Sequence, residues 1–162
     1  MAEHLAFKEL KPWDARALQA LYATVPDYFA LFGGLGLDEA EKALTDAPGV
    51  GESHHVWGVY RGDALIGHLD FLLGHPDAAT AYLGLLLIRG ELHGQGIGRR
   101  VFSQWLEWVA AGPFERVKLG IVEGNAQAFA FWKACGLIDT GERTTLAING
   151  VNCRVHLHEL RF

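Results

Sequence analysis

The feature that most constrains the fold is a glycine-rich segment at residues 93–98, His-Gly-Gln-Gly-Ile-Gly. It follows an almost wholly apolar stretch, Tyr82–Ile88, which is typical of a strand covered on both faces of a sheet. It leads into residues 97–111, where apolar side chains recur at helical spacing. Glycines let the backbone wrap closely round an anion, and the helix behind them supplies unpaired N–H groups. The segment therefore predicts a phosphate-binding turn between a strand and a helix.

The spacing of these glycines excludes two common nucleotide sites. A P-loop needs the pattern GxxxxGK[ST], but Gly98 is followed by two arginines and the chain contains no Lys-Ser or Lys-Thr pair. A dinucleotide-binding fingerprint needs GxGxxG, whereas Gly94, Gly96 and Gly98 are each two residues apart. The phosphate must therefore belong to another kind of ligand.

Length and composition indicate one globular domain over residues 1–162, half of them apolar and a fifth charged. The longest apolar run is too short to cross a bilayer and no signal peptide is visible, so we expect a cytoplasmic protein with no membrane partner. The two cysteines lie outside any CxxC spacing, which favours free thiols over a disulfide or a metal site. The net charge of −5 argues against a nucleic-acid partner.

Hydrophobic periodicity and turn residues predict alternating strands and helices. Asp14 and Asp38 are expected to cap helices, Pro26–Phe29 to interrupt the first helical region, and Asn149-Gly150 to form a hairpin turn. The expected elements are a strand at 4–10, helices from Asp14 through Leu21 and after Asp38, strands at 56–60, 64–73 and 82–88, a helix at 97–111, a strand at 116–122, a helix at 125–135, and strands at 144–148 and 151–160. This order predicts an α/β fold with a mixed central sheet flanked by helices.

The glycine segment resembles motif A of the GNAT superfamily of N-acetyltransferases, written [Q/R]xxGx[G/A], with Gly96 and Gly98 at its fourth and sixth positions. His93 stands at the first position, where the family has Gln or Arg, and Gly90 stands where the family often has proline. The histidine can still offer a hydrogen-bond donor towards phosphate. A second segment, Asn125–Leu137, resembles the family's NxxAxxFYxxxGF helix.

The resemblance covers residues 56–160 and implies a single-domain GNAT-type fold that uses acetyl-CoA as acyl donor and no metal. A primary amine on a small molecule or a peptide would attack the thioester directly, and an amide near Leu87 would stabilise the oxyanion. CoA would enter where the strands at 82–88 and 116–122 part. Dimers are frequent among the proteins it resembles, so a homodimer is also an expectation. The implied cofactor-binding residues are Leu86, Leu87, Ile88, His93, Gly94, Gln95, Gly96, Ile97, Gly98, Arg99, Asn125, Ala128 and Trp132.

The general base is not fixed by the resemblance, because the strand at 82–88 has no carboxylate. Asp70 in the neighbouring strand and Glu123 at the end of the following one are the candidates, and burial would raise the pKa of Asp70. A structural interpretation stays open for both: Asp70 as a partner of His68 or Tyr82, and Glu123 as a hydrogen-bond partner of the backbone before Asn125.

The general acid is equally open, because Trp132 occupies the position of the family's tyrosine and an indole cannot release a proton at neutral pH. Tyr28 and Tyr82 are the candidates, and water is the alternative. Residues 27–29 would also shape an acceptor pocket for a cationic amine, unless they form only a turn.

Two further hypotheses concern the activity itself. A chain with this fold could be a CoA-binding sensor or interaction module without catalysis, or a transferase for a longer acyl group such as succinyl, with Arg89 pairing the extra carboxylate. The neighbouring His54 and His55 are interpreted as a solvated loop pair, since no third metal ligand is spaced to join them.

Overall fold

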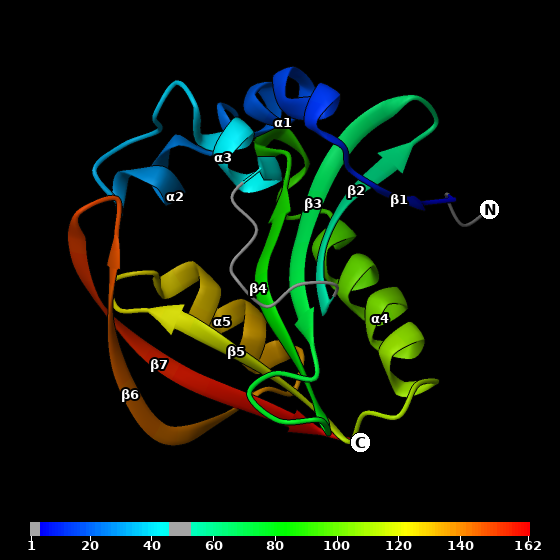
Figure 1. The fold of residues 1–162 in the computed structure, drawn as a ribbon, viewed down its shortest axis with the longest axis vertical. Helices are drawn as coiled ribbons and strands as arrows, with labels where there is room; N and C mark the ends of the chain where they lie inside the picture. The colour runs from blue at the N-terminus through cyan, green and yellow to red at the C-terminus, as the bar shows by residue number, and fades with distance from the viewer. Residues whose placement is uncertain (1–3, 46–52) are drawn as a thin grey trace.

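The computed structural model describes residues 4–45 and 53–162, which are built round one seven-stranded sheet in the order β1-β2-β3-β4-β5-β7-β6 (Figure 1). Neighbouring strands are antiparallel except for the parallel pair β4 and β5. The strands are β1 (Ala6–Glu9), β2 (His54–Arg61), β3 (Ala64–Leu73), β4 (Thr80–Ile88), β5 (Arg116–Val122), β6 (Ile138–Ile148) and β7 (Val151–Arg161). The helices are α1 (Ala15–Tyr22), α2 (Pro26–Ala30), α3 (Glu39–Thr45), α4 (Ile97–Ala110) and α5 (Ala126–Ala134), with 3-10 turns at Pro12–Asp14 and Gly90–Leu92. The expected α/β architecture is confirmed.

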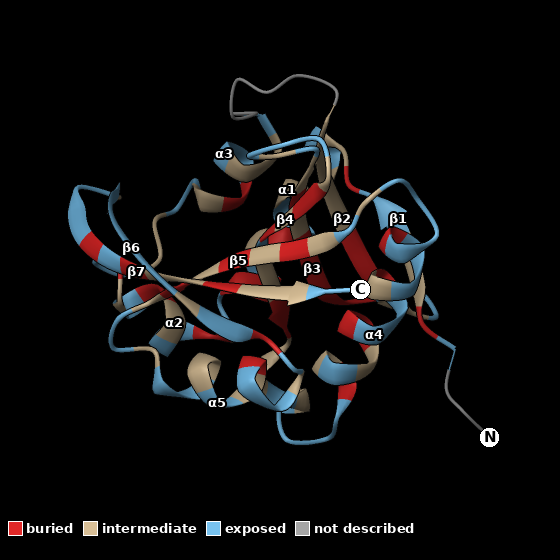
Figure 2. Ribbon diagram, turned by 90° about the horizontal axis from the view of Figure 1, so that it is seen from below, coloured by how far each residue is buried: buried red, intermediate tan, exposed pale blue. Residues whose placement is uncertain are grey.

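Helices cover both faces of the sheet, so there are two hydrophobic cores (Figure 2). On one face, α4 buries Val101, Trp105 and Val109, whose spacing of four residues aligns them along the helix. On the other face, α1 buries Leu18 and Leu21 together with side chains of α2 and α3. Each such side chain contributes about 1.5–3 kcal/mol on burial. Within residues 4–45 and 53–162, no helix has both the length and the apolarity to span a bilayer.

Three expectations about the elements are wrong. Asp14 does not cap α1, because its Oδ2 accepts from the Lys11 N–H at 2.8 Å and closes the preceding turn instead. Pro26 starts the short helix α2 rather than breaking a helix, since a proline in the first turn has no intrahelical bond to lose. β6 begins at Ile138 rather than Thr144, and its irregular first half, with Gly141 at a φ of 83°, has no clear alternation of apolar residues.

Candidate functional site

The sheet opens in its middle, between β4 and β5. These strands pair from Thr80↔Arg116 to Leu83↔Leu119, where the pairing ends. β4 then continues along β3 to Ile88, while β5 continues along β7. Backbone N–H and C=O groups on one side of β4 therefore face a gap rather than another strand.

Gly84 is a bulge at the point where the strands part. The register with β3 changes from Phe71↔Leu83 to Asp70↔Leu85, which leaves Gly84 unpaired. It is exposed, although Leu83 beside it is buried. A Cβ on Gly84 would lie 3.6 Å from Oδ1 of Asp70, so the bulge and this carboxylate are neighbours.

Two adjoining cavities occupy the gap. The larger, of about 840 Å³, lies between α2, the start of α4, and α5, and its size is common for small-molecule sites. The smaller, of about 210 Å³, lies between β5, α2 and the β6–β7 hairpin. The two cavities adjoin, because six residues line both: Tyr28, Leu85, Leu86, Asn125, Ala128 and Trp132.

The glycine segment forms one end of the larger cavity. Gly94 and Gly96 have φ values of 79° and 78°, and a Cβ on either would meet nothing within 4 Å. Their absence of a side chain is therefore needed for the backbone conformation rather than for space. The first i→i−4 bond of α4 runs from the Arg100 N–H to the Gly96 carbonyl at 3.1 Å, so the amides of 97–99 precede it at the positive end of the helix dipole.

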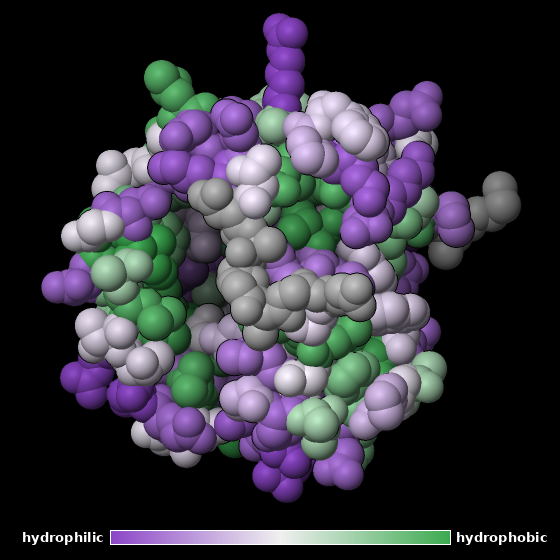
Figure 3. All heavy atoms as spheres, viewed as in Figure 1, coloured by the Kyte–Doolittle hydropathy of each residue, from purple (hydrophilic) through white to green (hydrophobic). Residues whose placement is uncertain are grey.

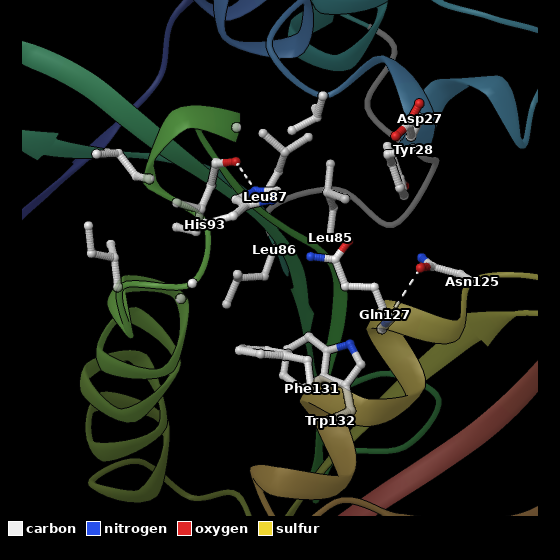
Figure 4. A pocket seen from close by; sticks show the side chains of 18 of the residues that line it. Asp27, Tyr28, Leu85, Leu86, Leu87, His93, Asn125, Gln127, Phe131 and Trp132 are labelled. Atoms are coloured by element: carbon white, nitrogen blue, oxygen red, sulfur yellow. Dashed lines mark hydrogen bonds between the residues drawn. The ribbon is translucent and has the colours of Figure 1, made fainter.

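His93 lies beside this segment, and its Nε2 donates to the carbonyl of Ile88 at 2.7 Å (Figure 4). A carbonyl can only accept, so this contact fixes the proton on Nε2 and leaves Nδ1 as an acceptor in the neutral ring. The expected donor towards phosphate is thus already used, and the histidine joins the loop to the end of β4. Gln95 does not line either cavity, because its side chain donates to the Glu91 carbonyl at 3.3 Å.

Gly90 connects the end of β4 to the end of α1. Its N–H donates to Oγ1 of Thr24 at 2.9 Å, and a Cβ here would collide with the Thr24 carbonyl oxygen. A proline at this position would lose the donor and meet the same backbone. The departure from the family pattern is explained by this close approach of two chain segments.

Asn125 begins α5, where its Oδ1 accepts from the Ala128 N–H at 3.2 Å (Figure 4). This is an N-cap, so the side chain orders the helix start that lines both cavities. Trp132, 8% exposed, packs edge-to-face on Phe102 and Phe131 and closes the wall further along α5.

Two tyrosines bring hydroxyl groups to the cavities. Tyr28 lines both of them, and burial, with smaller effects of Asp70 and Glu39, raises the pKa of its phenol to about 12. Tyr82 lines the smaller cavity, and burial raises its pKa as well. Both phenols therefore keep their protons at neutral pH and can act as donors.

Asp70 is half of a partly buried pair that no sequence pattern indicated. Its Oδ1 accepts from Nε2 of His54 at 2.8 Å. Burial raises the pKa of the Asp70 carboxyl, and the bond from His54 opposes this rise. His68 lies two residues away but contacts the Tyr22 hydroxyl at 3.0 Å instead, and its burial lowers its pKa to about 3.

The two adjacent histidines do not form a solvated loop pair, because both belong to β2. The side chain of His54 is 6% exposed, and the ring of His55 stacks on Phe71 at 5.1 Å. Within residues 4–45 and 53–162, no group of three or more His, Cys, Asp or Glu side chains is placed to hold a metal ion.

Other candidates lie outside the cavities. Glu123 is 52% exposed, and its Oε1 pairs with Nε2 of His156 at 3.2 Å. The backbone N–H of Glu123 donates to the Arg154 carbonyl. The guanidinium of Arg89 donates to the Leu65 carbonyl at 2.9 Å. Glu123, Arg89 and Asp70 are all absent from the residues that line the two cavities.

The wall of the smaller cavity was not expected from the sequence. Its residues come from α2 and the loop after it, from β4, β5 and α5, and from the last hairpin, which are far apart in the chain. They include Phe32, Gly84, Leu146, Ile148 and Val155. One sequence feature could have indicated this wall: Leu146 and Ile148 alternate with smaller residues, so both side chains lie on one face of β6, a largely exposed strand.

Comparison with known proteins agrees with this architecture. Residues 18–137 match the model of the acetyltransferase (GNAT) family. An acetyltransferase structure from Thermus thermophilus is 28% identical with a TM-score of 0.76, covering 99% of this chain and 100% of that one. A ribosomal-protein-S5-alanine acetyltransferase from Vibrio fischeri is 15% identical (TM-score 0.75; 99% and 94% covered), and a spermidine N-acetyltransferase mutant from Vibrio cholerae is 18% identical (TM-score 0.71; 99% and 95% covered). A search of curated proteins finds no significant match. The parted strands, the glycine turn and the family match lead to one conclusion: the chain belongs to the GNAT family of acetyltransferases.

Proposed function

We propose that the protein transfers an acetyl group from acetyl-CoA to a primary amine by direct attack. The observation that carries this proposal is the pair of adjoining cavities, one at the glycine turn and one at the Gly84 bulge, along the unpaired side of β4. The amides of Gly94, Gly96 and 97–99 would hold the pyrophosphate of CoA. The pantetheine amides would bond to β4 at Leu86 and Ile88, whose backbone groups face away from β3, as an added strand does.

The contacts already present refine this assignment. The Ile88 carbonyl accepts from His93, so pantetheine bonding is expected mainly at Leu86 and at the N–H of Ile88. We assign His93 and Asn125 to positioning, of the glycine turn and of α5 respectively. Ala128 and Trp132 would flank the pantetheine arm from α5.

Asp70 is the base that the geometry favours over Glu123. An alkylamine with a pKa near 10.4 is less than about 1% neutral at pH 7, so removing its proton limits the attack. The Asp70 carboxylate lies behind the Gly84 bulge, where partial burial raises its pKa, and one water would connect it to the amine. Glu123 is exposed and paired with His156.

The attack forms a C–N bond and places negative charge on the carbonyl oxygen, which an amide of β4 between Gly84 and Leu87 would stabilise. The amine proton passes to Asp70, the C–S bond breaks, and the CoA thiolate takes a proton from a phenol. Tyr28 is the favoured donor, because it is protonated and lines both cavities, and Tyr82 is the second.

We extend the proposal to three properties of the whole chain. One sheet runs from Ala6 to Arg161, which supports a single domain. Both cysteines are free thiols, which supports a reducing, cytoplasmic location. β6 is a long, exposed edge strand, and such an edge supports pairing with a second copy as a homodimer.

Thiol release from acetyl-CoA, measured with a panel of primary amines, tests the transfer, and calorimetry tests binding of acetyl-CoA separately. We expect both binding and amine-dependent release. Tight binding without release on any amine would instead indicate a sensor. Faster release from succinyl-CoA would indicate a longer-acyl transferase, which the position of Arg89 does not favour.

A further inference from the structure

We propose that the acceptor is a monoamine with an apolar body, such as an arylalkylamine or a hydrophobic alkylamine, and that this body occupies the smaller cavity. This inference rests on the proposed acetyl transfer and names its substrate class. The geometry behind it is the position of that cavity: it adjoins the Gly84 bulge on the far side from the glycine turn.

The chemistry of the cavity wall is the first argument. Among the described residues that line it, none is acidic or basic, and the polar side chains are two tyrosines and one asparagine. The remaining wall consists mainly of apolar side chains from α2, β4, β5 and the last hairpin: Phe32, Leu83, Leu85, Leu86, Leu119, Ile121, Val122, Trp132, Leu146, Ile148 and Val155.

Apolar side chains on β6 provide a second argument. Leu146 is 46% exposed and Ile148 is partly buried, although β6 is the outer strand and buries little of its own surface. Hydrophobic side chains gather over the β6–β7 hairpin beside a hollow in this face (Figure 3). Apolar residues that face an opening without serving the core mark a binding surface.

The hairpin is held in place, so this wall is preformed. Asn149 at its tip donates to Oε1 of Glu39 at 2.7 Å. A Cβ on Gly33 would lie 3.8 Å from Val151, which places the loop after α2 against the same tip. The carboxylate of Glu39 is thereby engaged with Asn149, and Glu39 is not among the residues that line the smaller cavity.

Charge decides between a monoamine and a polyamine. An amine must lose its proton to react, but each further ammonium group of a polyamine would stay charged inside the apolar cavity. Burying an unpaired charge is strongly unfavourable, and the described lining has no carboxylate to pair with it. Among the described residues that line the larger cavity, exposed Asp27 is the single carboxylate, so it can attract one incoming ammonium.

The volume of the smaller cavity favours a small acceptor. The cavity of about 210 Å³ lies below the roughly 300–1,000 Å³ of sites for drug-sized ligands. It therefore suits one aromatic ring or a short alkyl chain rather than a folded peptide terminus.

The first experiment compares kcat/KM for 2-phenylethylamine and hexylamine with that for spermidine and a lysine-rich peptide, using acetyl-CoA. We expect the apolar monoamines to be preferred by about ten-fold or more. Equal or better use of spermidine or the peptide would overturn the inference and leave acetyl transfer standing. Acetyl-CoA binding without thiol release on any amine would overturn both. A higher rate with octanoyl-CoA than with acetyl-CoA would also overturn the inference, since the acyl chain would then occupy the cavity.

The second experiment places one charge in the cavity. Ile148→Asp should lower kcat/KM for 2-phenylethylamine by about ten-fold or more and raise the relative use of spermidine, with little change in acetyl-CoA affinity. Thr145→Asp is the matched control, because it adds the same charge to the exposed opposite side of β6 and does not line the cavity. Equal effects of the two variants, or no effect of Ile148→Asp, would overturn the inference.

Discussion

The two cavities of the site are built by different means. The larger one is shaped at its end by backbone groups: two glycines at positive φ, the first amides of α4, and the unpaired side of β4. The smaller one is shaped by side chains from segments far apart in the chain. A backbone-built site tolerates different side chains provided that the glycines stay, whereas a side-chain-built site changes with each substitution. The first therefore suits a ligand common to a family, and the second suits an acceptor particular to this chain.

The largest effect is expected from Asp70→Asn, beside the Gly84 bulge, which keeps the shape of the side chain and removes the proposed base. Because general-base catalysis contributes about 10²–10⁴-fold, kcat should fall by that order while acetyl-CoA affinity stays unchanged. Steady-state thiol release and calorimetry measure the two quantities. Wild-type kcat in this variant would show that another group takes the proton.

Changing His54, the partner of Asp70, should shift the pH dependence of the reaction in a known direction. The hydrogen bond from His54 lowers the pKa of Asp70, so His54→Phe, which keeps a ring but removes the donor, should let that pKa rise further. Since the base acts when deprotonated, the low-pH limb of the kcat/KM profile should move to higher pH. Asp70→Asn should lose this limb. A shift to lower pH in His54→Phe would contradict the assignment.

The larger cavity, which is shaped by backbone groups, is tested by Gly96→Val. A β-branched residue at a φ of 78° is strained by about 1–3 kcal/mol, so the turn should change shape and lose its hydrogen bonds to the pyrophosphate. We expect CoA affinity to fall by about a hundred-fold, which corresponds to losing one or two charge-assisted bonds.

Gly62→Val is the matched control for that variant. Gly62 lies in the β2–β3 turn with a φ of 59° and open space around its Cβ position. Valine at this position therefore imposes similar backbone strain, but far from the cavities. It should lower the melting temperature without changing CoA affinity. If the two variants bind CoA equally well, the pyrophosphate is not held at the glycine turn.

This contrast explains how much the sequence could predict. The strand, glycine turn and helix around Gly96 form one continuous segment, and local physics makes its pattern readable. The pairing of His54 with Asp70 and the wall formed by Phe32 and Ile148 depend on which distant segments meet, which no local pattern specifies. The irregular start of β6 near Gly141 was missed for a related reason: its partner strand, rather than its own residues, defines it as a strand.

A smaller effect is expected in the wall of the larger cavity, where Gly90 meets Thr24. Gly90→Ala places a Cβ against the Thr24 carbonyl oxygen, closer than two atoms can approach, so the end of α1 must move away from β4. Overpacking of this kind lowers the free energy of unfolding by about 1–3 kcal/mol. Gly112→Ala is the control, because its nearest contact would be 3.3 Å. Urea unfolding compares them, and equal midpoints would mean that α1 is not held tightly against β4.

The smallest effect concerns Asn125, which belongs to both cavities. Asn125→Ala removes the acceptor for the Ala128 N–H and should cost about 0.5–2 kcal/mol of stability. Asn125→Asp keeps that acceptor, so it separates capping from ligand contact. If Asn125 acts only by ordering α5, the Asp variant should match the wild type in urea unfolding and in CoA affinity. A stable Asp variant that binds CoA poorly would instead show that the Asn125 amide contacts the ligand. CoA binding in the larger cavity would then depend on a side chain as well as on backbone groups.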